Sequence, residues 1–400
     1  MTSTRPTWAE VSRSRLIHNY SVLRRLAGPE TELLCVVKAN AYGHGLAECA
    51  RTLAGEGASW FGVTCVEEGV ALRRELPEAG ILVMSGIRGD GMVRYSRSDL
   101  FVASGEAAAL LEHDLTPVVW EPRHLVELET AAKRLRAAPG DCPIHLEVDT
   151  GMSRQGVRPQ DLEPLLERLG AGSPLRLQAA MTHFHTPGNA ELRAGQVREF
   201  VTAVETIVGA GLRPQFLSAG SSAGALHADA ELAGLVKRSG AQLMVRAGIS
   251  LYGYAPDAEH PTEGGGALQP VLSWKTRVVS VREIPAGATV GYDATFRAQR
   301  PSRIALLPVG YADGLNRLLS NQGWVVVRGQ RAPVAGRISM DHTTVDITDV
   351  AGVEVGDEVV LAGEQGGEKV TAEEMARLTG TIAYEVLCGI AARVPRVVVE

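Results

Sequence analysis

The sequence predicts an α/β protein in which an N-terminal (β/α)8 TIM-type barrel is followed by a mainly β C-terminal domain. From about residue 30 to 255, short apolar runs alternate with longer amphipathic segments, which is typical of repeated βα units around a parallel sheet. This span is close to the ~250 residues of a typical (β/α)8 barrel. After about residue 257, β-branched runs separated by proline and glycine take over. We therefore place the barrel at residues 8–257 and the second domain at residues 258–400.

Nine apolar runs are candidate barrel strands, although a closed barrel of this kind needs eight. We expect the run at 100–105 to be the extra one, because it lies closest to its neighbour. Amphipathic segments between the runs predict helices, for example at 121–138 and at 190–211, and the second ends on glycine as helices often do. The nine runs are 33–37, 60–65, 81–86, 100–105, 117–120, 144–151, 175–185, 214–222 and 243–253.

The second domain begins after a polar segment at 257–270, whose glycine and proline content indicates a linker or a loop at a domain edge. One helix is predicted at 371–380, where Thr371 and Glu374 form a capping box and Gly380 ends the helix. The predicted strands are 276–284, 302–310, 323–329, 343–350 and 357–364.

The composition argues against several classes of protein. The 46 acidic and 40 basic residues are spread along the chain without a polybasic run, which disfavours a nucleic-acid partner. The five cysteines are scattered and contain no CxxC pair, so we expect neither a disulfide framework nor a metal site. The N-terminus lacks an apolar signal segment and no run is long enough to cross a bilayer. We therefore expect a cytoplasmic protein without membrane contact.

Polar residues directly after the apolar runs are the candidate site, because active sites of (β/α)8 barrels lie at the C-terminal ends of the strands. Lys38, which ends the first run, is also compatible with a strand that simply leaves the core. A lysine, an arginine, glycine turns and serine hydroxyls suit an anionic, phosphate-bearing ligand that the lysine binds covalently. The candidates are Lys38, Tyr42, His44, Asp149, Thr150, Arg154, His183, His185, Ser221, Ser222, Arg246 and Gly248.

Eight motifs, in order along nearly the entire chain, resemble those of the alanine racemases, which are pyridoxal 5′-phosphate (PLP) enzymes built from a barrel and a β domain. The resemblance implies interconversion of L- and D-alanine, which supplies D-alanine for peptidoglycan. The motifs are VVKANAYGHG (36–45), HLEVDTGMSRQG (145–156), MTHFH (181–185), VRAGISLYGY (245–254), TVGYDATF (289–296), GYADGLNR (310–317), GRISMDHTTVDIT (336–348) and IAYEVLCGIAARVPR (382–396).

The resemblance also implies a set of cofactor-binding residues. Lys38 matches the lysine that binds PLP covalently, and Arg246 matches the arginine that faces the pyridine nitrogen. Because a guanidinium group stays protonated, it keeps that nitrogen unprotonated and makes the ring a weaker electron sink, which disfavours transamination. His183 and Arg246 match a relay that leads toward the second catalytic base of the family. The residues that match the phosphate-binding set are Tyr42, Ser222, Gly248, Ile249 and Tyr384.

Racemisation needs a base on each face of the Cα atom, so that one base removes the proton and the other returns it. By the resemblance, Lys38 is one base and Tyr292 of the β domain is the other. In the family this tyrosine comes from the partner subunit, which implies a homodimer with composite sites. The residues that match the substrate side and the access corridor are Arg154, Met340, Asp341, Tyr311 and Arg317.

Three positions depart from the family pattern. Glu147 stands where many members carry a carbamylated lysine that holds the arginine equivalent to Arg154, and we expect its carboxylate to supply that charge directly. Ser221 replaces an asparagine, and the sequence GYD at 291–293 replaces SYG. Neither of the last two changes removes a key functional group.

Alternative functions remain open from the sequence. A racemase for serine or for a broader range of amino acids fits the same motifs, because one methylene changes specificity by only about 1–3 kcal/mol. A non-catalytic PLP-binding protein of the same barrel type is expected to lack the β domain and Tyr292. A PLP-free barrel hydrolase would need a nucleophile–base pair or a metal cluster, which we do not find.

Overall fold

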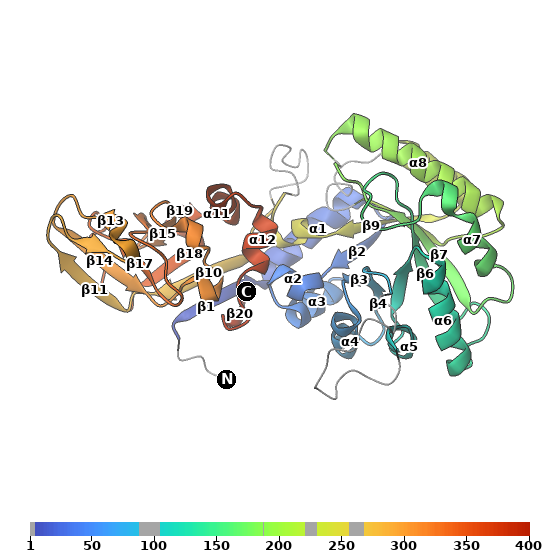
Figure 1. Cartoon of the computed structure of the whole chain (residues 1–400), viewed down its shortest axis with the longest axis horizontal. Helices are drawn as coiled ribbons and strands as arrows, with labels where there is room; N and C mark the ends of the chain where they lie inside the picture. The colour runs from blue at the N-terminus through green and yellow to red at the C-terminus, as the bar shows by residue number, and fades with distance from the viewer. Residues whose placement is uncertain (1–4, 88–104, 187, 221–229, 256–267) are drawn as a thin grey trace.

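The structure is a computed structural model that describes residues 5–87, 105–186, 188–220, 230–255 and 268–400. Figure 1 shows a barrel surrounded by helices at one end of the long axis and a mainly β region at the other end. This arrangement confirms the predicted fold class. Among the described residues, the search for a helix with the length and apolar character of a membrane span finds none.

Eight parallel strands close the barrel in chain order. Strand β9 returns to β2, where Arg246 is paired with Leu34. Strand β4 pairs directly with β5, so the barrel closes without the run at 100–105, most of which lies outside the described residues. The strands are β2 (Glu32–Val36), β3 (Trp60–Val63), β4 (Gly80–Val83), β5 (Thr116–Val119), β6 (Cys142–Glu147), β7 (Leu175–Thr182), β8 (Phe216–Ala219) and β9 (Gln242–Ala247).

Helices cover the outside of the barrel and bury one apolar face each. In the helix predicted at 121–138, Leu125, Leu128 and Ala132 are buried at helical spacing. The helix predicted at 190–211 ends at Gly209. The helices are α1 (Arg13–Ala27), α3 (Leu46–Gly55), α4 (Val66–Glu75), α5 (Glu106–Glu112), α6 (Pro122–Leu135), α7 (Glu163–Leu166), α8 (Ala190–Gly209) and α10 (Ala230–Ser239).

The β region is built around a seven-stranded sheet in which both ends of the chain meet. Strand β1 (Thr7–Ser12) pairs with β10 (Leu272–Arg277) on one side and with β20 (Arg396–Val399) on the other. The sheet therefore takes strands from both sides of the boundary predicted at residue 257. The other strands of the region are β11 (Ser280–Ile284), β12 (Thr289–Val290), β13 (Phe296–Arg297), β14 (Ser302–Leu307), β15 (Trp324–Val327), β16 (Gln330–Pro333), β17 (Thr343–Asp346), β18 (Glu358–Gln365) and β19 (Glu368–Val370).

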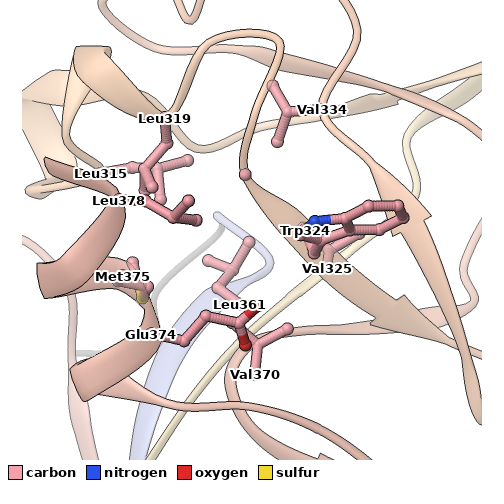
Figure 2. Close-up of a pocket in the computed structure, with 11 residues that line it drawn as sticks. Leu315, Leu319, Trp324, Val325, Val334, Leu361, Val370, Glu374, Met375 and Leu378 are labelled. Atoms are coloured by element: carbon pink, nitrogen blue, oxygen red, sulfur yellow. The ribbon is translucent and has the colours of Figure 1, made fainter.

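A small apolar cavity lies where the predicted C-terminal helix packs on the sheet. This helix, α11 (Ala372–Thr379), begins with the Thr371 hydroxyl accepting from the backbone N–H of Glu374, but the Glu374 carboxylate pairs with Arg331 and does not complete the predicted capping box. Figure 2 shows Leu319, Leu361 and Met375 around the cavity, which has a volume of about 10 Å³. Such a volume has room for about one water molecule, so the cavity is a packing gap and not a ligand site.

A second helix of the β region, α12 (Ala383–Cys388), is absent from the sequence prediction because it is short and has no capping side chain. It contacts the turn α2 (Lys38–Tyr42), which follows strand β2. The approach is so close that a Cβ atom on Gly43 would lie 2.4 Å from the carbonyl oxygen of Leu387. Only glycine fits this position, and the contact joins the β region to the rim of the barrel.

Replacing Gly43 should therefore weaken the contact between the two regions. We expect Gly43→Ala to lower the free energy of unfolding by about 2–5 kcal/mol, because left-handed strain and a backbone clash add up. Gly380→Ala is the matched control, since Gly380 is also left-handed but has open space around its Cα. In the control, the free energy of unfolding measured in urea should fall by only about 1–2 kcal/mol. Equal losses in the two variants would contradict the steric account.

Candidate active site

The turn that carries Lys38 is strained. Residues 39–42 all have φ between 52° and 55°, in the left-handed region, although none of them is glycine. Each such residue costs roughly 1–2 kcal/mol, and strain of this kind collects at functional sites. The backbone N–H groups of Ala39 and Thr64 both donate to the carboxylate of Glu68, at 2.7 and 2.9 Å. Glu68 thereby fixes the backbone directly after Lys38.

The Lys38 amine lies half-buried among other charges at the C-terminal end of β2. Burial lowers the pKa of Lys38, and the charges of Arg154 and Arg246 lower it further, while Glu68 acts in the opposite direction. A lower pKa increases the fraction of neutral amine, which is the form that acts as a nucleophile or a base.

Two phenol groups lie next to this turn. The ring of Tyr42 is 6.0 Å from that of Tyr384 in α12 and 5.1 Å from that of Tyr252, measured between centroids. Burial raises the pKa of Tyr42 well above its ordinary value and raises that of Tyr384 to about 12. Both phenols therefore stay protonated at neutral pH and offer O–H donors.

Arg246 is held rigidly at the end of β9 and is only 4% exposed. Its guanidinium group donates to the Ser218 carbonyl and hydroxyl at 2.9 and 2.7 Å, and to the Thr182 carbonyl at 2.7 Å. Burial lowers the pKa of Arg246 to about 10, so the group is still protonated at neutral pH. It is thus an immobile cation at the mouth of the barrel.

His183 is neutral and is oriented by Arg246. Burial lowers the pKa of His183 to about 3, with a further contribution from Arg246. Arg246 Nη2 lies 3.1 Å from His183 Nδ1, and an arginine can only donate. Nδ1 therefore accepts, and the single imidazole proton lies on Nε2, where it is available to a further acceptor.

Glu147 is buried at the end of β6, with 3% of its surface exposed. Its carboxylate accepts a hydrogen bond from Gln155, which also donates to the Met84 carbonyl. Burial raises the pKa of Glu147, while Gln155 and the charges of Arg246 and Arg154 lower it. The charge of Arg154 thus favours the ionised form of Glu147, but the hydrogen bond of Glu147 is to Gln155, the residue that follows Arg154.

Asp149 and Thr150, which follow β6, are held by local hydrogen bonds. The Asp149 carboxylate accepts from the backbone N–H groups of Gly151 and Ser153, and the hydroxyls of Thr150 and Thr182 lie 2.8 Å apart.

The remaining barrel candidates differ in their surroundings. Gly248 caps a short 3-10 helix, η3 (Ile249–Tyr252), so the backbone of Gly248 and Ile249 lies directly after β9. His44 is buried and stacks on Tyr252, and burial lowers its pKa to about 4. It is therefore a neutral side chain with a packing role. His185 is exposed. Ser221 and Ser222 lie outside the described residues.

Of the candidates in the β region, Tyr384 lies beside Tyr42 at the Lys38 turn, but Tyr292 is not brought to Lys38 within one chain. Tyr292 lies in the hairpin between β12 and β13, and Figure 1 shows β13 at the end of the molecule opposite the barrel. Tyr292 is 69% exposed, and Tyr311 and Met340 are also exposed. Asp341 is half-buried and pairs with Arg393.

Three polar residues that shape the site are not recognisable from the sequence: Glu68, Gln155 and Ser218. Glu68 belongs to a helix with several surface acids, Gln155 follows the more conspicuous Arg154, and Ser218 lies inside strand β8. No local pattern distinguishes them, because each also contacts a residue that is distant in the sequence: Ala39 for Glu68, Met84 for Gln155 and Arg246 for Ser218. Among the described residues, no group of His, Cys, Asp and Glu side chains is arranged to hold a metal ion.

Comparisons with known proteins agree over almost the whole chain. Residues 11–256 match the N-terminal domain of alanine racemase, and residues 271–398 match its C-terminal domain. The chain is 38% identical to an alanine racemase of Halothermothrix orenii over 394 residues, which is 98% of this chain and 97% of the relative. It is 39% identical to an alanine racemase of Symbiobacterium thermophilum over 398 residues, again with 98% and 97% coverage.

Solved structures give the same result. The structure of alanine racemase from Bacillus anthracis with bound L-Ala-P superposes with a TM-score of 0.85 at 28% identity, covering 100% of this chain and 96% of that one. The alanine racemase of Streptomyces lavendulae gives a TM-score of 0.84 at 29% identity, with 100% and 98% coverage. The chain therefore belongs to the alanine racemase family, a family of PLP-dependent amino-acid racemases.

Proposed function

We propose that this protein interconverts L- and D-alanine, using Lys38 and Tyr292 of the partner subunit as the two bases. By the same proposal it works in the cytoplasm and supplies D-alanine for peptidoglycan. The observation that carries the proposal is the half-buried Lys38 amine, whose pKa is lowered and which lies in a strained turn next to Arg246 and two phenols. These features occur in a chain whose relatives are alanine racemases over their full length.

The residues around Lys38 fit PLP by their chemistry. The close approach at Gly43 places the Tyr384 phenol beside that of Tyr42, and both are donors suited to phosphate oxygens. We expect these two, the backbone at Gly248 and Ile249, and Ser222 to hold the phosphate, while Lys38 binds the aldehyde carbon. When bound, PLP supplies an electron-withdrawing ring that stabilises negative charge at the substrate Cα.

Each protein group then has a defined task. Lys38 accepts or returns the Cα proton on one face, and the partner subunit's Tyr292 does so on the other face. Arg246 can only donate hydrogen bonds, so the pyridine nitrogen of PLP would stay unprotonated next to it. His183, oriented by Arg246, presents its Nε2 proton to a neighbour. Arg154 has the charge and exposure to bind the substrate carboxylate.

We infer that the protein is a homodimer with composite sites. The hairpin with Tyr292 lies at the opposite end of the molecule from the barrel, so its own Lys38 is out of reach. Tyr292, Tyr311 and Met340 are exposed on the β region, where a second copy would cover them. We propose that Tyr311, Met340 and Asp341 complete the substrate side of the partner's site.

The two-base proposal is tested with L- and D-alanine in D₂O. Tyr292→Phe should lower kcat for racemisation by about 10²–10⁴-fold, since it removes one acid–base group. Because Lys38 remains, one enantiomer should still exchange its Cα hydrogen without being converted, as followed by mass spectrometry and optical rotation. Lys38→Ala should lose both activities and the visible absorbance of lysine-bound PLP.

Tyr20→Phe is the control for this experiment, because Tyr20 is a buried tyrosine of α1 with no part in the proposed site. Its activity should equal that of the wild type. Full racemisation by Tyr292→Phe would refute the second base. If the wild-type protein binds PLP and racemises another amino acid but not alanine, alanine is not its substrate and this part of the proposal is wrong.

The proposal for Glu147 is that its carboxylate replaces a carbamylated lysine. Intact-protein mass should show no added carbon dioxide. Glu147→Gln should lower kcat/KM by about 10–100-fold, which corresponds to the ~1.5–3 kcal/mol of a charge-assisted contact. The exposed Glu78→Gln is the control and should be unchanged. An unchanged kcat/KM in Glu147→Gln would rule out this role.

A further inference from the structure

A buried carboxylate in the β region joins the two ends of the chain. The Asp313 side chain is 0% exposed and accepts hydrogen bonds from Arg5 at 2.8 and 3.0 Å and from Arg393 at 2.8 Å. It also accepts from the backbone N–H of Gly310 at 2.9 Å. Arg5 precedes β1 and Arg393 precedes β20, so two arginines from opposite ends of the sequence converge on one carboxylate.

The loop that contains Asp313 is fastened to a second loop, and together they carry Tyr311 and Met340. The backbone N–H of Tyr311 donates to the Ser339 carbonyl, and that of Ala312 donates to the Met340 carbonyl, both at 3.0 Å. A Cβ atom on Gly310 would lie 2.3 Å from the Ser339 carbonyl oxygen, so only glycine allows this approach. The two loops therefore form one rigid unit.

The same network reaches the side chain of Asp341. Arg393 donates through Nε to Asp313 and through Nη2 to Asp341, the latter at 2.7 Å. The backbone N–H of Ala391 also donates to the Asp313 carbonyl at 3.0 Å. Asp313 thus fixes the guanidinium group that in turn orients Asp341.

Asp313 acts in this network as an anion. Burial raises the pKa of Asp313, but hydrogen bonds from Arg5 and Arg393 outweigh that effect and leave the pKa below its ordinary value. Because the carboxylate is completely buried and all its contacts are within the protein, it has no access to a substrate.

We propose that Asp313 is a positioning residue that acts on the active site of the partner subunit: it orders Tyr311, Met340 and Asp341 where they meet the substrate carboxylate. This inference rests on the composite homodimer of the proposed function. Asp313 itself touches neither substrate nor cofactor, so its loss should affect substrate binding far more than the binding of PLP to Lys38.

The first test is Asp313→Asn, which keeps the shape of the side chain and an acceptor for Gly310 but removes the charge. We expect KM for alanine to rise about tenfold or more, with a smaller change in kcat and an unchanged cofactor absorbance per subunit. Asp349→Asn is the matched control, since Asp349 is an exposed carboxylate that also pairs with an arginine, Arg300. An unchanged KM in Asp313→Asn would overturn the proposal.

Arg393→Lys is the second variant, and it tests the positioning role even if Asp313→Asn fails to fold. Lysine keeps the positive charge but lacks the fork that bonds Asp313 and Asp341 at once. It should reproduce the rise in KM with normal cofactor absorbance. A wild-type KM in this variant would overturn the proposal.

Mixed dimers, purified through two different tags, test on which subunit Asp313 acts. In the first arrangement, one chain carries Lys38→Ala and the other Asp313→Asn, so the one site with Lys38 is completed by unaltered loops and should have a wild-type KM. In the second arrangement, both changes lie on one chain, so the remaining site is completed by altered loops and should have the raised KM.

Equal KM values in the two arrangements would overturn the positioning role while leaving the proposed function intact. A wild-type protein that is monomeric in light scattering, or that racemises no amino acid, would overturn the proposed function and the positioning role together. A difference between the arrangements, in the stated direction, is the result that only a role across the subunit interface explains.

Discussion

The close approach between Gly43 and the Leu387 carbonyl is the contact on which the site depends. Here α12 of the β region packs directly on the turn α2, and no side chain fits at position 43. Tyr384 then lies against Tyr42, so that one phenol from each region meets at the turn α2. Because the barrel alone supplies only one of these phenols, the barrel and the β region form a single functional unit.

Buried hydrogen bonds hold the charged and polar groups around Lys38 in place. Arg246 is fixed by hydrogen bonds to Ser218 and Thr182, and it holds His183 in one neutral tautomer. Burial and the two nearby arginines lower the pKa of Lys38, and the Glu68 carboxylate moderates the shift while it holds the strained turn. These residues therefore influence both the position of the Lys38 amine and its pKa.

The barrel and the strand-end residues could be predicted from the sequence because their signals are local. A run of buried apolar residues marks a parallel strand, and the polar residue after it must lie at the rim, as Lys38 does after β2. The run at 100–105 resembles the others, and only the direct pairing of β4 with β5 removes it from the barrel. The helix α12 carries no cap and is too short for a periodic pattern, so its formation depends on packing against α2.

The fold class, the order of the motifs and the residue types at the ends of the strands follow from the sequence alone, since periodicity and motif order are properties of the chain before it folds. Which groups meet is known from the folded chain alone: Gln155 and not Arg154 bonds to Glu147, Glu68 accepts from the N–H of Ala39, and Arg5 and Arg393 both bond to Asp313. The physical reason is that each of these contacts depends on how the strands and loops pack, and some of them join distant segments, 29 residues apart for Ala39 and Glu68 and 308 residues apart for Arg5 and Asp313.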